Sequence, residues 1–361
     1  MRLEYFGILL VCRAWWTITM RLKLFILSIA LVTGCSPAPI ITANGCDSFD
    51  PCITQNGIAV LAPPEVAKPI LLSAQEGARY FKRYFGKEAL PIAIVSGGKV
   101  SPEMHINLKE AGYESALPWL SANDKIALAQ STIRRQLIEQ TKGMPPEQQE
   151  AIIKMALAKM DKTETMPGTM SAIEQGALTH ELGHKWFISA FPREDDEVNN
   201  TQRYGGWAPD WLDETAAVLL ENESMVSRRR KAFKTMKSED LYPLKEFFTM
   251  EHPALKSALA LNEKFGSNNT MGESRAIILT DEEADEFLQG SAATDPTIFY
   301  TQARGFADYV MSATQDEQIF AKLAQHLSVD QTLESWLAQT DGLDNSLEAL
   351  TQDWNKWLET R

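Results

Sequence analysis

Two of the chain's five histidines, His180 and His184, lie four residues apart in the stretch ALTHELGHKW, and Glu181 directly follows the first of them. On an α-helix, residues four apart are neighbours on one face, so the two imidazoles can converge on a single ion. Zinc takes histidine nitrogens at about 2.0 to 2.1 Å, which this geometry can supply. Glu181 would lie beside the ion, close enough to hold a metal-bound water without being a ligand. The spacing therefore predicts a metal site with an adjacent base.

The residues around the pair predict the helix that such a site needs. Ser171 and Glu174 have the spacing of a capping box, in which each side chain satisfies a backbone donor of the other at a helix start. Apolar residues then recur at steps of three and four, as on an amphipathic helix: Ile173, Ala177, Leu178, Leu182 and Phe187. The alternative is an ordinary helix whose two histidines are solvated or packed in the core.

A catalytic zinc site takes three protein ligands and leaves one position open for water. The chain directly after the histidine pair reads KWFISAFPRED and offers no third histidine. A carboxylate from a second helix is the other common solution. The segment APDWLDETAAVLLENE is typical of such a helix, with Asp210 as the expected N-cap and acidic residues in the first turn.

The stretch HELGH matches H-E-x-x-H, the signature of zinc metallopeptidases. Together with WLDETAA, in which Glu214 lies thirty residues after His184, it resembles the gluzincins, the thermolysin-like and aminopeptidase-like clan. The resemblance implies that His180, His184 and Glu214 bind one zinc ion. It also implies that Glu181 is the general base.

The chain departs from the pattern of the clan at two places. Thr215 stands where the members with a W-x-x-E-G-x-A motif often have glycine, and no aspartate lies four residues after Glu214 as in thermolysin. The second departure leaves the hydrogen-bond partner of the two histidines unidentified. Asp213 is a competing third ligand, because sequence alone does not fix the rotation of the helix.

The later segment TIFYTQARGFADYVM resembles a helix of the same clan on which a tyrosine points at the metal. The resemblance implies that Tyr300 donates its hydroxyl to the oxyanion formed in the reaction. A core tyrosine is the alternative reading of Tyr300, and Tyr204 is the alternative donor. Arg304, one turn after Tyr300, either binds a substrate carboxylate or is an exposed structural arginine, and the second reading is preferred.

The implied activity is zinc-dependent hydrolysis of peptide bonds in a peptide or protein substrate, with endo- and exopeptidase action both open. Two alternatives remain. One is a non-catalytic envelope lipoprotein, with zinc or without metal, that acts in binding or assembly. The other is hydrolysis of an ester or amide in a small molecule by the same chemistry.

The N-terminal residues 1–34 are expected to be a signal peptide. Arg21 and Lys23 precede an apolar run, and we expect translation to begin at Met20 and residues 1–19 not to be translated. The end of the run, VTGC, resembles the lipobox of bacterial lipoproteins, which implies cleavage before Cys35 and acylation of its thiol. The resemblance implies a protein tethered to a lipid bilayer in the cell envelope, at the periplasmic face of the outer membrane. A plain secretory signal is the alternative.

Charge and cysteines add two expectations. The net charge of -13 argues against nucleic acid as a partner, because an acidic surface repels it. Cys46 and Cys52 in CDSFDPC are expected to form a disulfide, because an exported protein meets an oxidising compartment. A metal role is the weaker alternative, since no further Cys or His flanks them at zinc-finger spacing.

The remaining pattern predicts an α+β protein. We expect a lipid-anchored linker over residues 35–60, an N-terminal α/β part with a helical insertion over 61–168, and a helical zinc-binding part over 169–361. Within the α/β part, the sequence predicts a helix that is capped by Ser73 and stops at Gly86, a strand at LPIAIV, and a second strand at EMHINL. The resemblance to the gluzincins implies a zincin-like arrangement, with the metal in the cleft between the two parts.

Overall fold

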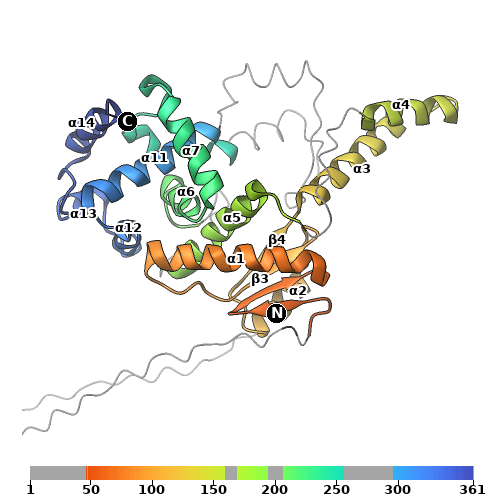
Figure 1. The fold of residues 1–361 in the computed structure, drawn as a ribbon, viewed down its shortest axis with the longest axis horizontal. Helices are drawn as coiled ribbons and strands as arrows, with labels where there is room; N and C mark the ends of the chain where they lie inside the picture. Colours follow the sequence, from red (N-terminus) through yellow and green to blue (C-terminus); the bar gives the residue numbers. More distant parts are fainter. Residues whose placement is uncertain (1–45, 47, 159–168, 194–205, 256–295, 361) are drawn as a thin grey trace, which may run out of the picture. The chain divides into compact units, whose positions relative to one another are not determined.

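The computed structural model describes residues 46, 48–158, 169–193, 206–255 and 296–360 (Figure 1). The predicted signal peptide, the predicted acylation site Cys35 and Tyr204 lie outside these residues. Within the part of the chain that is described, Cys46 and Cys52 are joined by a disulfide with their Cα atoms 5.5 Å apart. None of the described helices combines the length and the hydrophobicity needed to cross a membrane.

A four-stranded sheet organises the N-terminal half, with its strands in the order β1 (Ile53–Gln55), β2 (Ile58–Leu61), β3 (Ile92–Ser96) and β4 (Ser115–Trp119). Strands β1 and β2 form an antiparallel hairpin. The turn between them is Asn56-Gly57, and both residues have positive φ, as this kind of tight hairpin turn requires. The pairs β2–β3 and β3–β4 are parallel.

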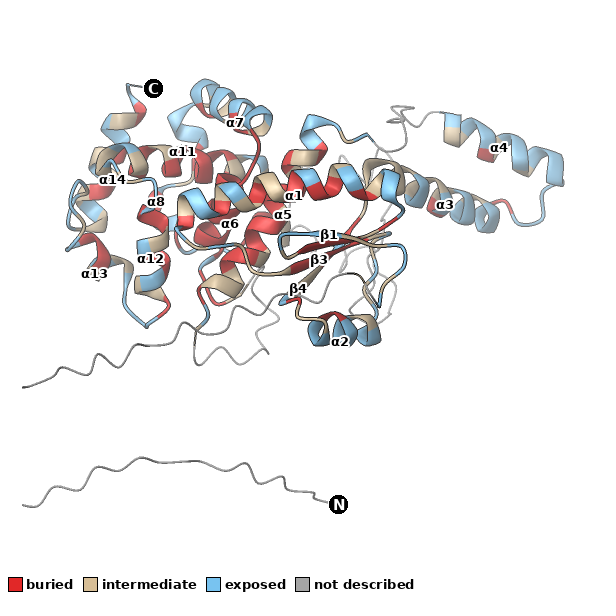
Figure 2. Ribbon diagram, turned by 60° about the horizontal axis from the view of Figure 1, so that its bottom comes forward, coloured by how far each residue is buried: buried red, intermediate tan, exposed pale blue. Residues whose placement is uncertain are grey.

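The two faces of the sheet are covered by different helices. Alternate residues such as Val60, Ile94 and Leu117 point into the main core, under α1 (Pro64–Phe85). Their neighbours, such as Ala93, pack on the other face with α2 (Pro102–Glu110). Figure 2 shows α1 and α2 on opposite sides of the strands. Each helix is the crossover between two parallel strands, which needs a connection of about a dozen residues or more.

Several boundaries differ from the prediction. The sheet begins within the segment predicted as a linker, because the polar QNG stretch is a hairpin turn. The predicted strand EMHINL is wrong: it forms α2, whose start is set by Ser101 and the following proline. Helix α1 starts at Pro64, so Ser73 lies inside it and donates its hydroxyl to a backbone carbonyl within the helix. The predicted stop at Gly86 is confirmed, with φ of 66° at this residue.

The next two helices, α3 (Ala122–Gln140) and α4 (Pro146–Ala158), pack against each other. Both are largely exposed (Figure 2). Ser121 caps α3 through a complete capping box with Asp124.

The C-terminal half is helical. Its elements are α5 (Ala172–Ala190), α6 (Asp210–Leu219), α7 (Glu223–Thr235), the short 3-10 helix η1 (Ser238–Asp240), α8 (Leu244–Phe247), α11 (Pro296–Thr314), α12 (Ile319–Leu327), α13 (Leu333–Leu337) and α14 (Leu347–Leu358). Aromatic side chains fill the space between them. Trp211 of α6, for example, has its ring centroid 4.6 Å from that of Phe248 and 5.8 Å from that of Phe306.

Helix α5 joins the two halves. It contacts α1 and β4 on the sheet side and α6 and α7 on the helical side. The predicted class, a small sheet-containing N-terminal part followed by a mainly helical part, is confirmed for the described residues.

Candidate metal centre

The helix predicted around the histidine pair exists as α5. Ser171 caps it by accepting a hydrogen bond from the backbone N–H of Glu174, at 3.1 Å. The other half of the predicted capping box is replaced by a tertiary contact, since Glu174 Oε1 accepts from the backbone N–H of Ala122, at 2.8 Å. The side chain of Glu174 therefore ties the start of α5 to the start of α3.

Three buried side chains meet between α5 and α6. His180, His184 and Glu214 each offer a ligand atom, and these atoms lie within 4.8 Å of one another. His180 Nε2 is 3.4 Å from Glu214 Oε1, and His184 Nε2 is 3.7 Å from Glu214 Oε2. Two ligand atoms at 2.0 to 2.1 Å from a tetrahedral zinc are about 3.3 Å apart. The group could therefore bind one metal ion with little rearrangement.

The close approach of the two helices depends on the glycine of HELGH. A Cβ added to Gly183 would lie 2.8 Å from the backbone Cα of Ala217 in α6. Real Cβ contacts of this length essentially never occur, so any larger residue would push α6 away. Gly183 thus sets the distance over which Glu214 reaches the two histidines.

In both histidines Nε2 faces Glu214, and the second ring nitrogen, Nδ1, contacts a further carboxylate. Glu221 Oε1 lies 3.1 Å from His180 Nδ1, and Asp213 Oδ2 lies 2.9 Å from His184 Nδ1. Such contacts fix the ring orientation and leave Nε2 as the nitrogen that faces the ligand group. Asp213, considered above as a competing ligand, lies instead behind His184. The resemblance left the hydrogen-bond partners of the two histidines unidentified. In the structure they are Glu221 for His180 and Asp213 for His184.

A third histidine supports Glu214. His252 Nε2 lies 3.1 Å from Glu214 Oε2, and its Nδ1 accepts from the backbone N–H of Ala254, at 3.1 Å. This arrangement makes Nε2 the protonated nitrogen, which donates to the carboxylate. Asp210 holds the segment in place by accepting from the backbone N–H of His252, at 2.7 Å. The predicted N-cap role of Asp210 is wrong, since Pro209 occupies the N-cap position.

Helix α6 is buried along its whole length although it carries three carboxylates, Asp210, Asp213 and Glu214. Burial of a carboxylate is costly unless it is paired or binds a metal. Glu214 Oε1 is buried and accepts no hydrogen bond from the residues that the structure describes. With Glu221, which is also buried, the centre holds four acidic groups. The donor set and the excess of negative charge both suit a divalent cation.

The pKa values of the central groups show how strongly they interact. Burial alone would raise the pKa of Glu214, but the nearby His180 and the hydrogen bond from His252 lower it to about 2. Burial alone would lower the pKa of His184, but Asp213, Glu214 and Glu181 together raise it to about 9. In the metal-free protein at neutral pH, His184 is therefore a cation between carboxylates.

Two further predicted residues lie at this centre. The ring centroid of Tyr300, a half-buried residue of α11, is 5.8 Å from that of His180 and 5.5 Å from that of His252. Burial and the charge of Glu214 raise the pKa of its phenol, which keeps the hydroxyl protonated. Glu181 is half-buried, and its negative charge contributes to the raised pKa values of both His184 and Tyr300. Tyr204, the alternative donor, lies outside the described residues.

Arg304 is a buried residue of α11. Its side chain is only 2% exposed and donates to Asp308, at 2.5 Å, on the same helix. An arginine buried to this degree offers no surface to a substrate carboxylate, so a structural role is favoured. The expectation that this arginine is exposed is wrong, because its side chain is enclosed in the helical part.

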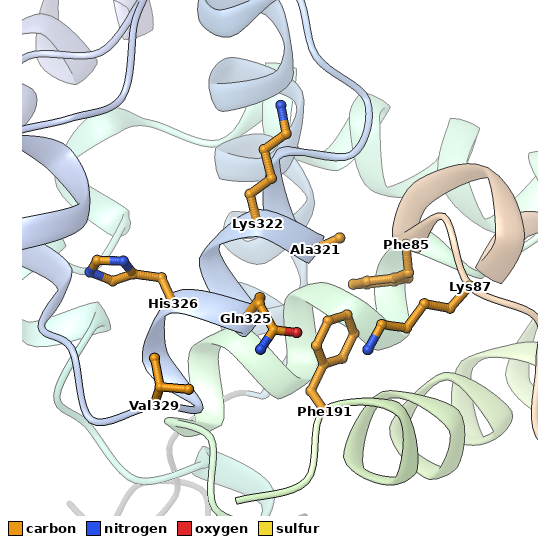
Figure 3. A pocket seen from close by; sticks show the side chains of 8 residues that line it. All are labelled: Phe85, Lys87, Phe191, Ala321, Lys322, Gln325, His326 and Val329. Atoms are coloured by element: carbon orange, nitrogen blue, oxygen red, sulfur yellow. The ribbon is translucent and has the colours of Figure 1, made fainter. Parts of the chain in front are cut away.

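A separate hollow lies beside the C-terminal end of α5 and is shown in Figure 3. Phe85 and Phe191 form its apolar side, and the ammonium of Lys87 lies 4.0 Å from the ring centroid of Phe191. Its remaining lining residues come from α12 and from the second residue after that helix: Ala321, Lys322, Gln325, His326 and Val329. This hollow shares no residue with the metal group, so it is not the place for chemistry at that group.

Sequence reasoning missed His252, Glu221 and the role of Asp213. Glu221 lies in the short connection between α6 and α7, and His252 lies in a segment 38 residues after Glu214. A histidine next to a proline at that distance has no spacing signal. Comparison of the chain with family models, characterised proteins and solved structures gave no match.

Proposed function

We propose that this protein is a zinc-dependent peptidase of the gluzincin type that acts in the bacterial cell envelope. The observation that carries the proposal is the buried convergence of His180, His184 and Glu214, with Glu181 beside them on α5. The envelope location and the lipid tether rest on the expected lipobox at Cys35.

Zinc is the metal that the donor set favours. Two imidazole nitrogens and one carboxylate oxygen are the ligands of a common class of catalytic zinc sites, which keep a fourth position for water. Magnesium and calcium prefer sets made of oxygen alone. The carboxylates behind the histidines are typical of zinc sites as well, because they fix each imidazole and raise its basicity.

The protein residues have distinct parts in the proposed reaction. When bound, zinc lowers the pKa of its water to about 7 and polarises a carbonyl. Glu181 accepts the proton of the attacking water and then delivers it to the leaving amine. The hydroxyl of Tyr300 donates to the developing oxyanion, where a well-placed donor is worth about 3 kcal/mol. His180, His184 and Glu214 are held by their partners throughout the reaction.

The proposal includes a zincin-like cleft between the sheet-containing part and the helical part. It is supported by the position of α5, which contacts β4 and α1 on one side and α6 and α7 on the other. Because the metal ligands come from α5 and α6, the reacting group of a substrate would lie at this boundary.

The test is the zinc content of purified protein that begins at residue 35 with Cys35 replaced. We expect one zinc per chain, measured by elemental analysis after dialysis against a weak chelator. In Glu214→Ala we expect most of the zinc to be lost, because one of three ligands is gone. Glu348→Ala, a change at an exposed position of α14, is the control and should keep its zinc. A parent protein that takes up no zinc after reconstitution would overturn the proposal.

A further inference from the structure

Arg229 of α7 makes a two-pronged contact with the buried Glu221. Its Nε donates to Glu221 Oε2, at 2.5 Å, and its Nη2 donates to Oε1. The Glu221 side chain is fully buried, and that of Arg229 is 12% exposed. The same Oε1 lies 3.1 Å from His180 Nδ1. One carboxylate therefore connects the guanidinium to a ligand of the metal centre.

The guanidinium has a second contact, with the ring of Tyr300. The Cζ atom of Arg229 lies 5.0 Å from the centroid of the Tyr300 ring, within the range of a cation–π interaction. The Tyr300 ring in turn meets the ring of His180 nearly edge-on, with 75° between their planes. The contacts form a closed loop from His180 through Glu221 and Arg229 to Tyr300 and back to His180.

We propose that Arg229 is a positioning residue of the metal centre, which orients His180 through Glu221 and holds the ring of Tyr300 through a cation–π contact. This inference rests on the proposed function, because it assigns Arg229 a task at that site. A guanidinium suits the task because its planar fork can engage a carboxylate while its face stacks on an aromatic ring. The ammonium of a lysine makes neither the fork nor the stack.

The backbone around Glu221 supports this assignment. Asn222, the next residue, caps α7 by accepting from the backbone N–H of Met225, at 3.1 Å, and its Nδ2 donates to the carbonyl of Ala172, at 2.6 Å. The connection that carries Glu221 is thus fixed both to α7 and to the first turn of α5. Arg229, two turns into α7, reaches back to the carboxylate from a rigid helix, so its guanidinium is placed before any ligand binds.

The adjacent residue supplies a matched control. Arg230 also makes a two-pronged contact with a carboxylate, to Asp308 at 2.8 and 2.9 Å, but its side chain is 51% exposed. Arg229→Lys and Arg230→Lys are therefore the same chemical change at neighbouring positions of one helix. Only the first touches the loop of contacts at the metal centre.

Three measurements test the inference. Chelator competition on the full chain should show weaker zinc binding in Arg229→Lys, by less than the roughly 10- to 100-fold expected for loss of Glu221, the direct partner of the metal-ligating histidine. Cobalt-substituted Arg229→Lys should have altered visible absorption bands, because His180 is no longer held in one orientation. In protein labelled with carbon-13 tyrosine, the Tyr300 resonance, assigned by its loss in Tyr300→Phe, should shift in Arg229→Lys. Arg230→Lys should leave all three unchanged.

A double-mutant comparison separates positioning from general loss of structure. If Arg229 acts through Glu221, then Arg229→Lys should weaken zinc binding much less in a Glu221→Gln background than in the parent. Zinc binding and cobalt spectra that are equal in Arg229→Lys and Arg230→Lys would overturn the inference and leave the metal site intact. A parent protein that binds neither zinc nor cobalt would overturn the proposed function itself.

Discussion

Glu181, the residue next to the first histidine, differs from both histidines in its exposure to solvent. His180 and His184 are buried, whereas Glu181 between them is half-buried on the same helix. A general base must reach a substrate, and a metal ligand need only reach the ion. The difference in exposure therefore agrees with the roles proposed for the three residues.

Glu181→Gln is the change that tests these roles. It keeps the size of the side chain and removes the carboxylate that accepts the proton, so we expect zinc content to stay at one per chain. Turnover should fall by about 100- to 10,000-fold, the range of general-base catalysis. The measurement is cleavage of a quenched fluorescent peptide library, with Glu348→Gln as the control for a Glu-to-Gln change. Equal turnover in the two variants would remove Glu181 from the mechanism.

The sequence predicts the candidate metal ligands better than the residues that support them. Spacing of four on a helix is a local property, so the pairing of His180 with His184 can be seen in the sequence. The contact of His252 with Glu214 depends on how a distant segment packs on α6, which no local pattern encodes. The same holds for Glu221, because its partner His180 lies 41 residues away.

At the scale of elements, the α5–α6 contact determines whether the site forms. We expect Gly183→Ala to displace α6 by adding a methyl group against the Cα of Ala217. The overpacking should cost about 1 to 3 kcal/mol of stability. Zinc affinity should fall about tenfold or more, since both Glu214 and Asp213 move with α6.

Gly77→Ala is a suitable control for this prediction. Its added Cβ would lie 3.1 Å from the side chain of Thr179, on the α1 side of α5. Its effect on the melting temperature depends on how far Thr179 yields, but the zinc affinity should be kept, and both are measured on the purified chain. Loss of zinc affinity in both variants alike would show that the site responds to any disturbance of α5, and that the Gly183 contact has no special part.

Strong local sequence signals predict α5 and β3, whereas the signals for α2 and β4 are weak. The helix of α5 has a cap and a clear period, and β3 is a buried apolar run between turn residues. The EMHINL segment is short, and an apolar pattern of six residues does not distinguish a strand from a helix. Strand β4 was missed for a related reason: ESALPW contains a proline and little β-branched sequence, and its place at the sheet edge is set by pairing with β3.

At the scale of the whole molecule, the metal centre contributes to stability in a way that depends on pH. In the metal-free protein, the pKa of His184 is raised from 6.5 to about 9. Its contribution is therefore fully present below pH 6.5 and is lost as the pH rises through about 9. The pKa of Glu214 is lowered from 4.5 to about 2, so its contribution is present above pH 4.5 and is lost as the pH falls through about 2.

Bound zinc would have the opposite pH dependence: the stability that it adds should increase as the pH rises. Because Asp213 occupies Nδ1 of His184, the proton on Nε2 must leave before that nitrogen can bind zinc. For each proton released, the affinity for zinc rises about tenfold per pH unit. At a fixed zinc concentration, this adds about 1.4 kcal/mol of stabilisation for each pH unit. We therefore expect the zinc-induced increase in melting temperature, measured by calorimetry, to be larger at pH 8 than at pH 6. Glu214→Ala should show little increase at either pH, and an increase in the parent that is independent of pH would mean that His184 carries no proton for zinc to displace.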